Sequence, residues 1–422
     1  MKELEVNNNC QNIARVTLMQ GGLADDIDLM RDTYSKGILN VFTEVTSFDM
    51  SERFRRFQMS TSVSGIFLPT AWLQVYSSLK MLVVAGQGKQ YREELDGFEE
   101  QTYIVGFRLG GASSTPAAIG GVPGSVINSF AIDHFESYIR VATSSQILTG
   151  DYDDDSINNR LFVLSLPEKN ITTGNFIMEE VGRLEGLGRE GEEIKSVRFL
   201  DNAAFLVTFR RTDPFYTIDL TDPKNPKVVG ELEVTGFSSY LQPINPDQSQ
   251  VLAVGQETDP ETGDVSGLQL SLFDVSNLAN PSLVTKYVVE EEDDVGSYSD
   301  AQWDFKAFRY LPQSKILILP VTLSFTDMGE NNFDGFWTFD IGTTTNQAIT
   351  KGYEFSHVRP ERIFSFCWYP ATLPPRSFVF SGDLVTLKSH SILRHSLNTG
   401  EMQWELDLDE ENDDDCSDYF VF

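Results

Sequence analysis

The sequence predicts an all-β protein assembled from similar four-stranded antiparallel sheets. Between residues 40 and 408, short runs of branched aliphatic and aromatic residues alternate with glycine, proline, asparagine and aspartate. This pattern is typical of short strands joined by tight turns rather than of helices. One strand-and-turn segment also recurs along the chain at nearly constant intervals, which indicates a repeat architecture.

The last apolar residue of the recurring strand measures the repeat. It lies at Met50, Leu109, Leu166, Leu220, Val275, Ile341 and Leu397. The mean interval of about 58 residues holds four strands of the usual five to six residues together with their loops. Seven such units predict a seven-bladed β-propeller, with six or eight blades as alternative counts. A β-sandwich is the alternative architecture, but a sandwich does not require equally spaced units.

The fourth unit illustrates the predicted blade. Its expected strands are residues 195–200, 203–209, 216–220 and 228–234. The second is apolar throughout, so it should be a central strand. The fourth alternates apolar and polar residues, as expected of an outer strand with one face in water.

Three regions are expected along the chain. Residues 1–39 form an atypical segment that contributes to the first blade, and residues 40–408 form the propeller. Residues 409–422 form an acidic tail that could supply a closing strand. The first residues lack a cationic start followed by an apolar core, so no secretory signal is expected in this chain.

The cysteines are too few and too scattered for a disulfide scaffold or a thiolate zinc site. A bridge between Cys10 and Cys416 could lock the ends of the propeller in an oxidising compartment. A bridge between Cys367 and Cys416, or three free thiols, are equal alternatives.

The charge balance limits the classes of partner. The 422 residues include 32 Lys plus Arg and 63 Asp plus Glu, which gives a formal net charge of −31. Such a charge repels nucleic acids and anionic lipid surfaces and favours cationic partners. No apolar run approaches the roughly 20 residues of a spanning helix, so membrane insertion is not expected. The chain is expected to be a monomer.

Several stretches between residues 70 and 400 resemble a known family. They are residues 122–143, 181–187, 194–199, 206–209, 213–220, 230–241, 270–275 and 300–308. They are similar to secreted bacterial and archaeal proteins with a C-terminal β-propeller domain distantly related to WD-40 repeats. The resemblance implies a propeller fold and an exported origin, and it implies no reaction. Phe305 stands where the family pattern usually has a histidine, so no role for that histidine is carried over.

Polar residues on the innermost strands are the binding candidates, because ligands of propellers commonly bind at the channel that these strands line. They are Asp133 and His134 in the third blade, Lys195 and Arg198 in the fourth, and Asp304 and Lys306 in the sixth. Asp304 and Lys306 are two residues apart, so they should share one face of a strand. The alternative interpretation is that these charges form ion pairs between blades.

Acidic loops supply the metal candidates. Carboxylates could hold calcium at Asp151, Asp153 and Asp155, or at Asp327 and Asp334 in the long sixth-blade insertion. The first loop departs from an EF-hand, with Ser156 at its sixth position and Phe162 at its twelfth. The alternative is a solvated acidic loop that maintains solubility.

No catalytic motif is present, and none of the four histidines lies at ligand spacing from another. The sequence therefore favours a non-enzymatic binding module for an unknown protein or small-molecule ligand, with no cofactor except calcium to be considered. The alternative function is a calcium-assisted hydrolase at the channel mouth, with carboxylates such as Asp133 and Asp304.

Overall fold

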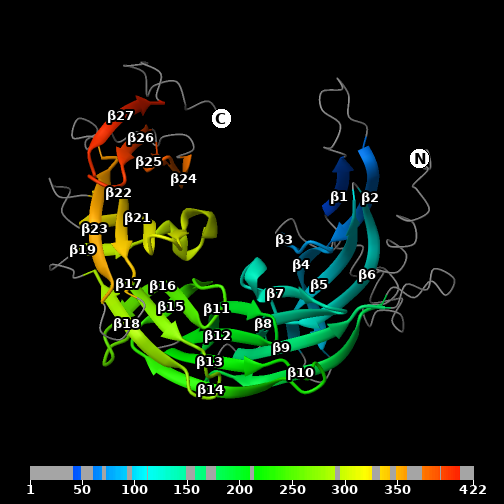
Figure 1. The fold of residues 1–422 in the computed structure, drawn as a ribbon. Coiled ribbons are helices and arrows are strands. Elements are labelled where there is room, and N and C mark those ends of the chain that lie inside the picture. Colours follow the sequence, from blue (N-terminus) through cyan, green and yellow to red (C-terminus); the bar gives the residue numbers. More distant parts are fainter. Residues whose placement is uncertain are drawn as a thin grey trace, which may run out of the picture. The chain divides into compact units, whose positions relative to one another are not determined.

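The computed structural model describes residues 41–48, 60–68, 73–92, 97–111, 113–148, 157–167, 177–209, 213–289, 295–325, 333–342, 348–358, 373–389 and 391–408. The regular elements in these ranges are β-strands and three short 3-10 helices (Figure 1). The predicted all-β class is confirmed. Within the same ranges, no helix has the length and apolar character needed to cross a bilayer.

Six antiparallel units of at least four strands account for most described strands. The first unit contains β3 (Leu73–Ser77), β4 (Met81–Arg92), β5 (Gly97–Gly110) and β6 (Ser113–Pro123). The second unit contains β7 (Ile132–Phe135), β8 (Tyr138–Leu148), β9 (Ile157–Ser165) and β10 (Glu179–Leu187). A short pairing of β5 with β8 joins them into one sheet of eight strands. The third unit contains β11 (Glu193–Leu200), β12 (Ala203–Phe209), β13 (Asp213–Asp219) and β14 (Lys227–Val234). The fourth unit contains β15 (Phe237–Pro243), β16 (Gln250–Thr258), β17 (Val265–Asp274) and β18 (Ser282–Val288).

The last two units follow the same plan. The fifth contains β21 (Ile316–Phe325), β22 (Phe333–Asp340) and β23 (Thr350–Ser356), and both β19 (Val295–Tyr298) and β20 (Arg309–Leu311) pair with β21. The sixth contains β24 (Leu373–Phe380), β25 (Asp383–Ser389), β26 (Ser391–Ser396) and β27 (Met402–Asp407). The short helices are η3 (Ser129–Ala131), η4 (Asp300–Gln302) and η5 (Phe305–Ala307).

Six described units match the alternative count named from the sequence. A separate two-stranded sheet, β1 (Val41–Phe48) and β2 (Ser60–Leu68), lies where the atypical first blade was expected. Residues 1–39, Met50 and the acidic segment 409–422 lie outside the described residues, so the rest of that prediction is untested.

The residues that measure the repeat occupy equivalent positions in the six described units. In each unit, the backbone N–H of the recurring apolar residue donates to the carbonyl of the residue directly before a central strand. These central strands are β4, β8, β12, β16, β21 and β25. The donor and acceptor pairs are Leu109 and Lys80, Leu166 and Ser137, Leu220 and Asn202, Val275 and Ser249, Ile341 and Lys315, and Leu397 and Gly382, at 2.8–3.0 Å. The recurring apolar residue therefore marks the same hydrogen bond in all six units.

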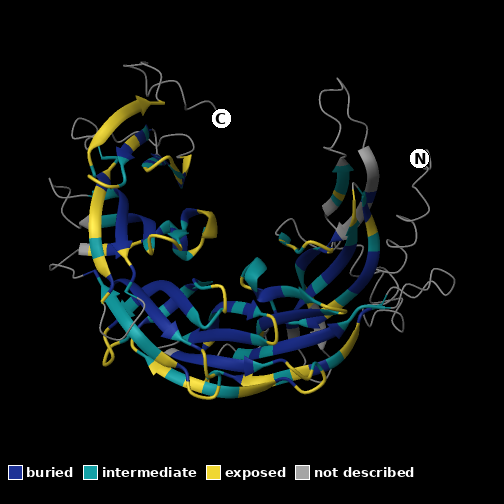
Figure 2. Cartoon of the chain, viewed as in Figure 1, coloured by how far each residue is buried: buried dark blue, intermediate teal, exposed yellow. Residues whose placement is uncertain are grey.

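The fourth predicted unit has the strands expected of it. Strands β11 to β14 pair in chain order, and β12 is buried from Ala204 to Thr208. The outer strand β14 has no fully buried residue, and it alternates half-buried and exposed residues from Gly230 to Val234. Figure 2 shows the same contrast in other units, with largely buried central strands and an exposed outer strand β27. The assignments of central and outer strands are confirmed.

The chain divides into two compact units, one of residues 1–210 with 216–229 and one of residues 211–215 with 230–422. Each has its own apolar core of strand residues that are almost fully buried. The first core includes Ile139, Val141, Leu161, Phe162 and Leu206, and the second includes Leu252, Leu270, Leu317, Leu319 and Phe339.

Candidate functional site

Asp133 lies on β7, the first strand of its unit, and its carboxylate is bound by one guanidinium and one hydroxyl. The guanidinium of Arg140 on β8 donates to Asp133 Oδ2 through Nε at 2.8 Å and through Nη2 at 2.5 Å. The hydroxyl of Tyr76 on β3 donates to Asp133 Oδ1 at 3.1 Å. Arg140 also donates through Nη1 to the carbonyl of Asp201, in the turn between β11 and β12. Hydrogen bonds to this buried ion pair therefore connect three consecutive units.

Two aromatic rings complete the surroundings of Arg140, which is 3% exposed. Its guanidinium carbon lies 4.7 Å from the ring centroid of Phe135 and 5.2 Å from that of Phe199. Buried charges in proteins are stabilised by such pairing and hydrogen bonding. Asp133 and Arg140 are cross-strand neighbours within one unit, so their ion pair does not itself join blades as the alternative interpretation expected. The hydrogen bonds from Tyr76 and to the carbonyl of Asp201 make the contacts with the neighbouring units.

His134 also contacts the preceding sheet. Its Nδ1 lies 3.1 Å from the hydroxyl oxygen of Ser78, in the turn between β3 and β4. Burial lowers the pKa of His134, whereas the neighbouring carboxylate of Asp133 opposes that shift. The ring is therefore neutral at pH 7, and it packs between sheets.

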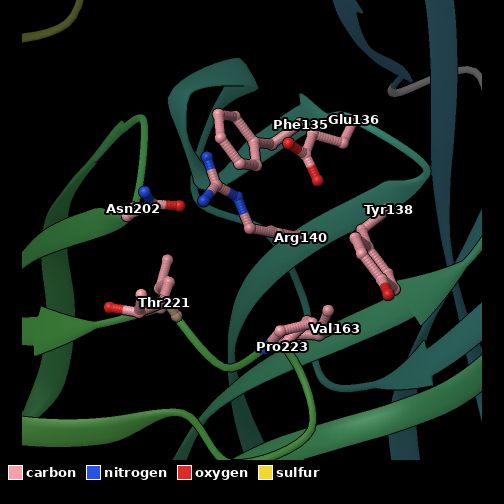
Figure 3. Close-up of a pocket in the computed structure, with 9 residues that line it drawn as sticks. Phe135, Glu136, Tyr138, Arg140, Val163, Asn202, Thr221 and Pro223 are labelled. Atoms are coloured by element: carbon pink, nitrogen blue, oxygen red, sulfur yellow. The ribbon is translucent and has the colours of Figure 1, made fainter.

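A small pocket lies beside Arg140. It is lined by the turn between β7 and β8, by Asn202 and by the segment from Leu220 to Pro223. Its volume is about 40 Å³, which is enough for a few water molecules. Figure 3 shows the Arg140 guanidinium next to the ring of Phe135 at one side of this pocket. Because Arg140 already has its acceptors, its guanidinium is not available to a ligand in this pocket.

Lys195 and Arg198 both lie on β11, as expected. Lys195 Nζ pairs with Glu193 on the same strand at 3.1 Å. The guanidinium carbon of Arg198 lies 4.6 Å from the ring centroid of Phe130 in η3. These residues do not converge on the pocket beside Arg140.

The strand expected for Asp304 and Lys306 is wrong, because the two residues belong to a 3-10 turn. Asp304 is the N-cap of η5, and its carboxylate accepts a hydrogen bond from the backbone N–H of Lys306 at 3.1 Å. Its other oxygen pairs with Arg376 Nη1 on β24 at 2.7 Å. A local signal existed: Ser299 and Gln302 form a capping box at η4, directly before η5.

Of the metal candidates, Asp151, Asp153, Asp155 and Asp327 lie outside the described residues. Asp334 is described, and its Oδ1 pairs with Lys388 Nζ at 2.7 Å and accepts from the hydroxyl of Thr322 at 2.7 Å. In the described part of the chain, no group of three or more His, Cys, Asp or Glu residues could hold a metal ion. Calcium binding therefore stays a prediction.

His357 lies between the fifth and sixth sheets of the second compact unit. Its Nδ1 is 2.7 Å from the Ser391 hydroxyl oxygen, and its Nε2 is 2.9 Å from that of Thr386. Burial lowers the pKa of His357 to about 4. Lys388 and His395 act in the same direction, and Asp334 opposes them.

This shift predicts a loss of stability in mild acid. The unfolded chain takes up a proton on His357 near its usual pKa of about 6.5, whereas the folded chain resists protonation until about pH 4. Stability contributed by the neutral ring is therefore complete above pH 6.5 and is lost as the pH falls toward 4, by about 3 kcal/mol in total. Urea unfolding at several pH values should give a shallower dependence for His357→Gln. Equal slopes for both proteins would contradict this assignment.

A larger cavity is lined in part by Ala142 and Ser144, which follow Arg140 on β8. It is lined by residues from three consecutive sheets, and its volume is about 230 Å³. The lining residues are Gln87, Glu100, Ser125, Val126, Ile127, Ala142, Ser144, Glu193 and Ile194. We call it the Glu100 cavity. None of its residues was a candidate from the sequence.

Only some of the hydrogen-bond acceptors in the Glu100 cavity already have partners in the protein. Among the described residues, the carboxylate of Glu100 has no hydrogen bond or ion pair. Gln87 Nε2 donates to the carbonyl of Val126 at 3.0 Å, which leaves the Gln87 side-chain oxygen as an acceptor. The second carboxylate, Glu193, is shared with Lys195. Ser144 is committed, since its hydroxyl oxygen accepts from Ile194 N and donates to Asn159.

Comparison with protein families gives one match over most of the chain. The model of a family described as "Beta propeller domain" matches residues 20–400. An uncharacterized protein of Archaeoglobus fulgidus is 38% identical over 221 residues, which are 52% of this chain and 30% of that protein. An uncharacterized protein of Methanocaldococcus jannaschii is 37% identical over 202 residues, 48% of this chain and 28% of that protein. The chain thus spans less than a third of the length of these curated relatives.

Among solved structures, the periplasmic gluconolactonase of Pseudomonas aeruginosa is similar with a TM-score of 0.45 and 11% identity. The similarity covers 87% of this chain and 95% of that one.

Proposed function

Since the chain belongs to the β-propeller domain family, we propose that it is a non-enzymatic binding module that takes a primary ammonium group into the Glu100 cavity. A fold of this kind presents loops and strand ends on a rigid scaffold, and its function resides in the site rather than in the fold. The observation that carries the proposal is a cavity of about 230 Å³ with an uncommitted carboxylate.

The acceptors in the cavity suit an ammonium group. A primary ammonium has three N–H donors and no acceptor. The Glu100 carboxylate, the Gln87 side-chain oxygen and the Ser125 hydroxyl could accept them. The side chains of Val126 and Ile194 give the cavity apolar walls for a short alkyl group. The volume suits a small ligand, since drug-sized ligands need roughly 300 Å³ or more.

The state of the channel carboxylates supports binding over hydrolysis. The hydrolase interpretation needs Asp133 or Asp304 to be available for an ion or a proton. Asp133 is paired with Arg140, and Asp304 is paired with Arg376. Each carboxylate would have to give up its guanidinium partner before it could hold an ion or act in a reaction.

Calorimetric titration with n-butylamine at pH 7 tests the proposal. We expect Glu100→Gln to weaken binding about tenfold, because a charge-assisted hydrogen bond is replaced by a neutral one. The control Glu231→Gln removes the same charge from an exposed position on β14 and should bind like the wild type. n-Butanol and tetramethylammonium, which lack the charge or the N–H donors, should not bind. Equal affinity of wild type and Glu100→Gln would exclude this site.

A further inference from the structure

Four large aromatic side chains are exposed in the second compact unit, on η5, on the residue after η4 and on β24. Their exposed fractions are 66% for Trp303, 42% for Phe305, 53% for Phe378 and 74% for Phe380. We call these four residues the aromatic patch. Single exposed apolar residues are ordinary. Here η5 and β24 are adjacent, because Asp304 pairs with Arg376 and the Arg309 guanidinium lies near the Phe378 ring, and exposed aromatic residues on adjacent elements mark an interaction site.

The backbone that carries the patch is firmly anchored. Within the capping box of η4, Gln302 accepts a hydrogen bond from Ser299 N and a second from Gln256 Nε2 at 2.9 Å. Ala301 and Ala307 are fully buried beneath the two turns. The ion pair of Asp304 with Arg376 attaches η5 to β24. The exposed rings are therefore presented by a fixed backbone, so a partner would lose little entropy in ordering it.

Two cations lie within the aromatic patch. The guanidinium carbon of Arg309 is 5.8 Å from the Phe378 ring centroid, and Lys306 Nζ is 5.8 Å from that of Phe305. Neither cation forms an ion pair with a described residue, and Arg309 Nε is buried without a hydrogen-bond partner there. The neighbouring carboxylate of Asp304 is already neutralised by Arg376.

We propose that the aromatic patch binds a segment of a partner protein that carries apolar side chains beside a carboxylate. Trp, Phe and Arg are enriched at protein interfaces, where a few such residues supply most of the binding energy. The carboxylate would pair with Arg309 and Lys306. The net charge of −31 does not oppose this locally, because charges beyond about 8–10 Å are screened at physiological salt. Exposed fractions of 42–74% indicate an open surface that suits a polypeptide better than an enclosed small molecule.

Fluorescence anisotropy with a labelled peptide tests this inference. The probe carries leucine and phenylalanine on both sides of paired glutamates, and companion peptides carry glutamine or lysine instead. We expect Phe380→Ser to weaken binding of the glutamate peptide about tenfold, as for an interface anchor. Arg309→Gln should weaken it about fivefold and should abolish the preference for glutamate over glutamine.

Matched controls separate the patch from general effects of charge and hydrophobicity. Val265→Ser removes an exposed apolar side chain elsewhere in the same compact unit, and Lys224→Gln removes an exposed cation. Both should bind as the wild type does. Glu100→Gln should also bind the glutamate peptide as the wild type does. A negative result for the aromatic patch can therefore be told apart from a negative result for the ammonium site. Unchanged affinity of Phe380→Ser, or tighter patch-dependent binding of the lysine peptide, would overturn the inference.

Discussion

Replacing Arg140 with methionine is expected to lower the free energy of unfolding by about 3–5 kcal/mol, the usual cost of breaking a buried ion pair. Methionine keeps much of the apolar stem but leaves the Asp133 carboxylate, 17% exposed, without its cation. The carbonyl of Asp201 also loses its donor from the neighbouring sheet. Urea unfolding followed by circular dichroism measures the change.

The control for this variant is Arg183→Met. Arg183 forms a bidentate pair with Glu180, but its side chain is 49% exposed. Exposed pairs contribute about 0–1 kcal/mol, so this variant should be nearly as stable as the wild type. The double variant with Asp133→Asn and Arg140→Met should recover part of the loss, because no unpaired carboxylate remains. If Arg140→Met costs no more than Arg183→Met, the ion pair does not hold the sheets together.

Replacing Gly236 with alanine is expected to destabilise the protein by about 3 kcal/mol or more, within the range of strained backbone and overpacking effects. Gly236 lies between β14 and β15 and has a φ of +81°, a backbone conformation that residues other than glycine rarely adopt. An added Cβ would also overlap the carbonyl oxygen of Gln256 and the side-chain oxygen of Gln269. Both causes act on buried backbone that cannot move without breaking the pairing of β15 with β16.

Gly186→Ala separates these two causes. Gly186 has φ +71°, yet a Cβ there meets no atom within 4 Å. This variant should therefore lose only the conformational part, about 1–2 kcal/mol. Thermal unfolding of the two variants measures the difference. An equal loss for both would show that the crowding at Gly236 is relieved at no cost.

The strands could be predicted from the sequence because their signals are local. Apolar runs and Asp-Pro or Asn-Pro turns recur along the chain, and the recurring apolar residue makes the same backbone hydrogen bond in its unit, as at Leu220 and Val275. The turn at Asp304 was missed because an aspartate that caps its own backbone overrides the alternation expected of a strand. The two-residue spacing of Asp304 and Lys306 fits both a strand face and a capped 3-10 turn, so spacing alone does not distinguish them.

The candidate site depended on contacts between sheets, which no local pattern shows. Asp133 was identified, but its partner Arg140 lies on the next strand. Arg140 in turn donates to the carbonyl of Asp201, which lies in the next sheet. Glu100 and Glu193 line one cavity although they are far apart in sequence. Their convergence depends on the register and twist of three sheets. The local sequence around each residue contains no signal for that convergence.

The most direct test of the central claim is a crystal structure of the protein grown with n-butylamine at saturating concentration. We expect electron density for the ligand in the Glu100 cavity, with its nitrogen within hydrogen-bond distance of the Glu100 carboxylate and its alkyl chain against Val126 and Ile194. Ordered water alone in that cavity, under conditions where calorimetry reports binding, would contradict the claim and place the ligand elsewhere.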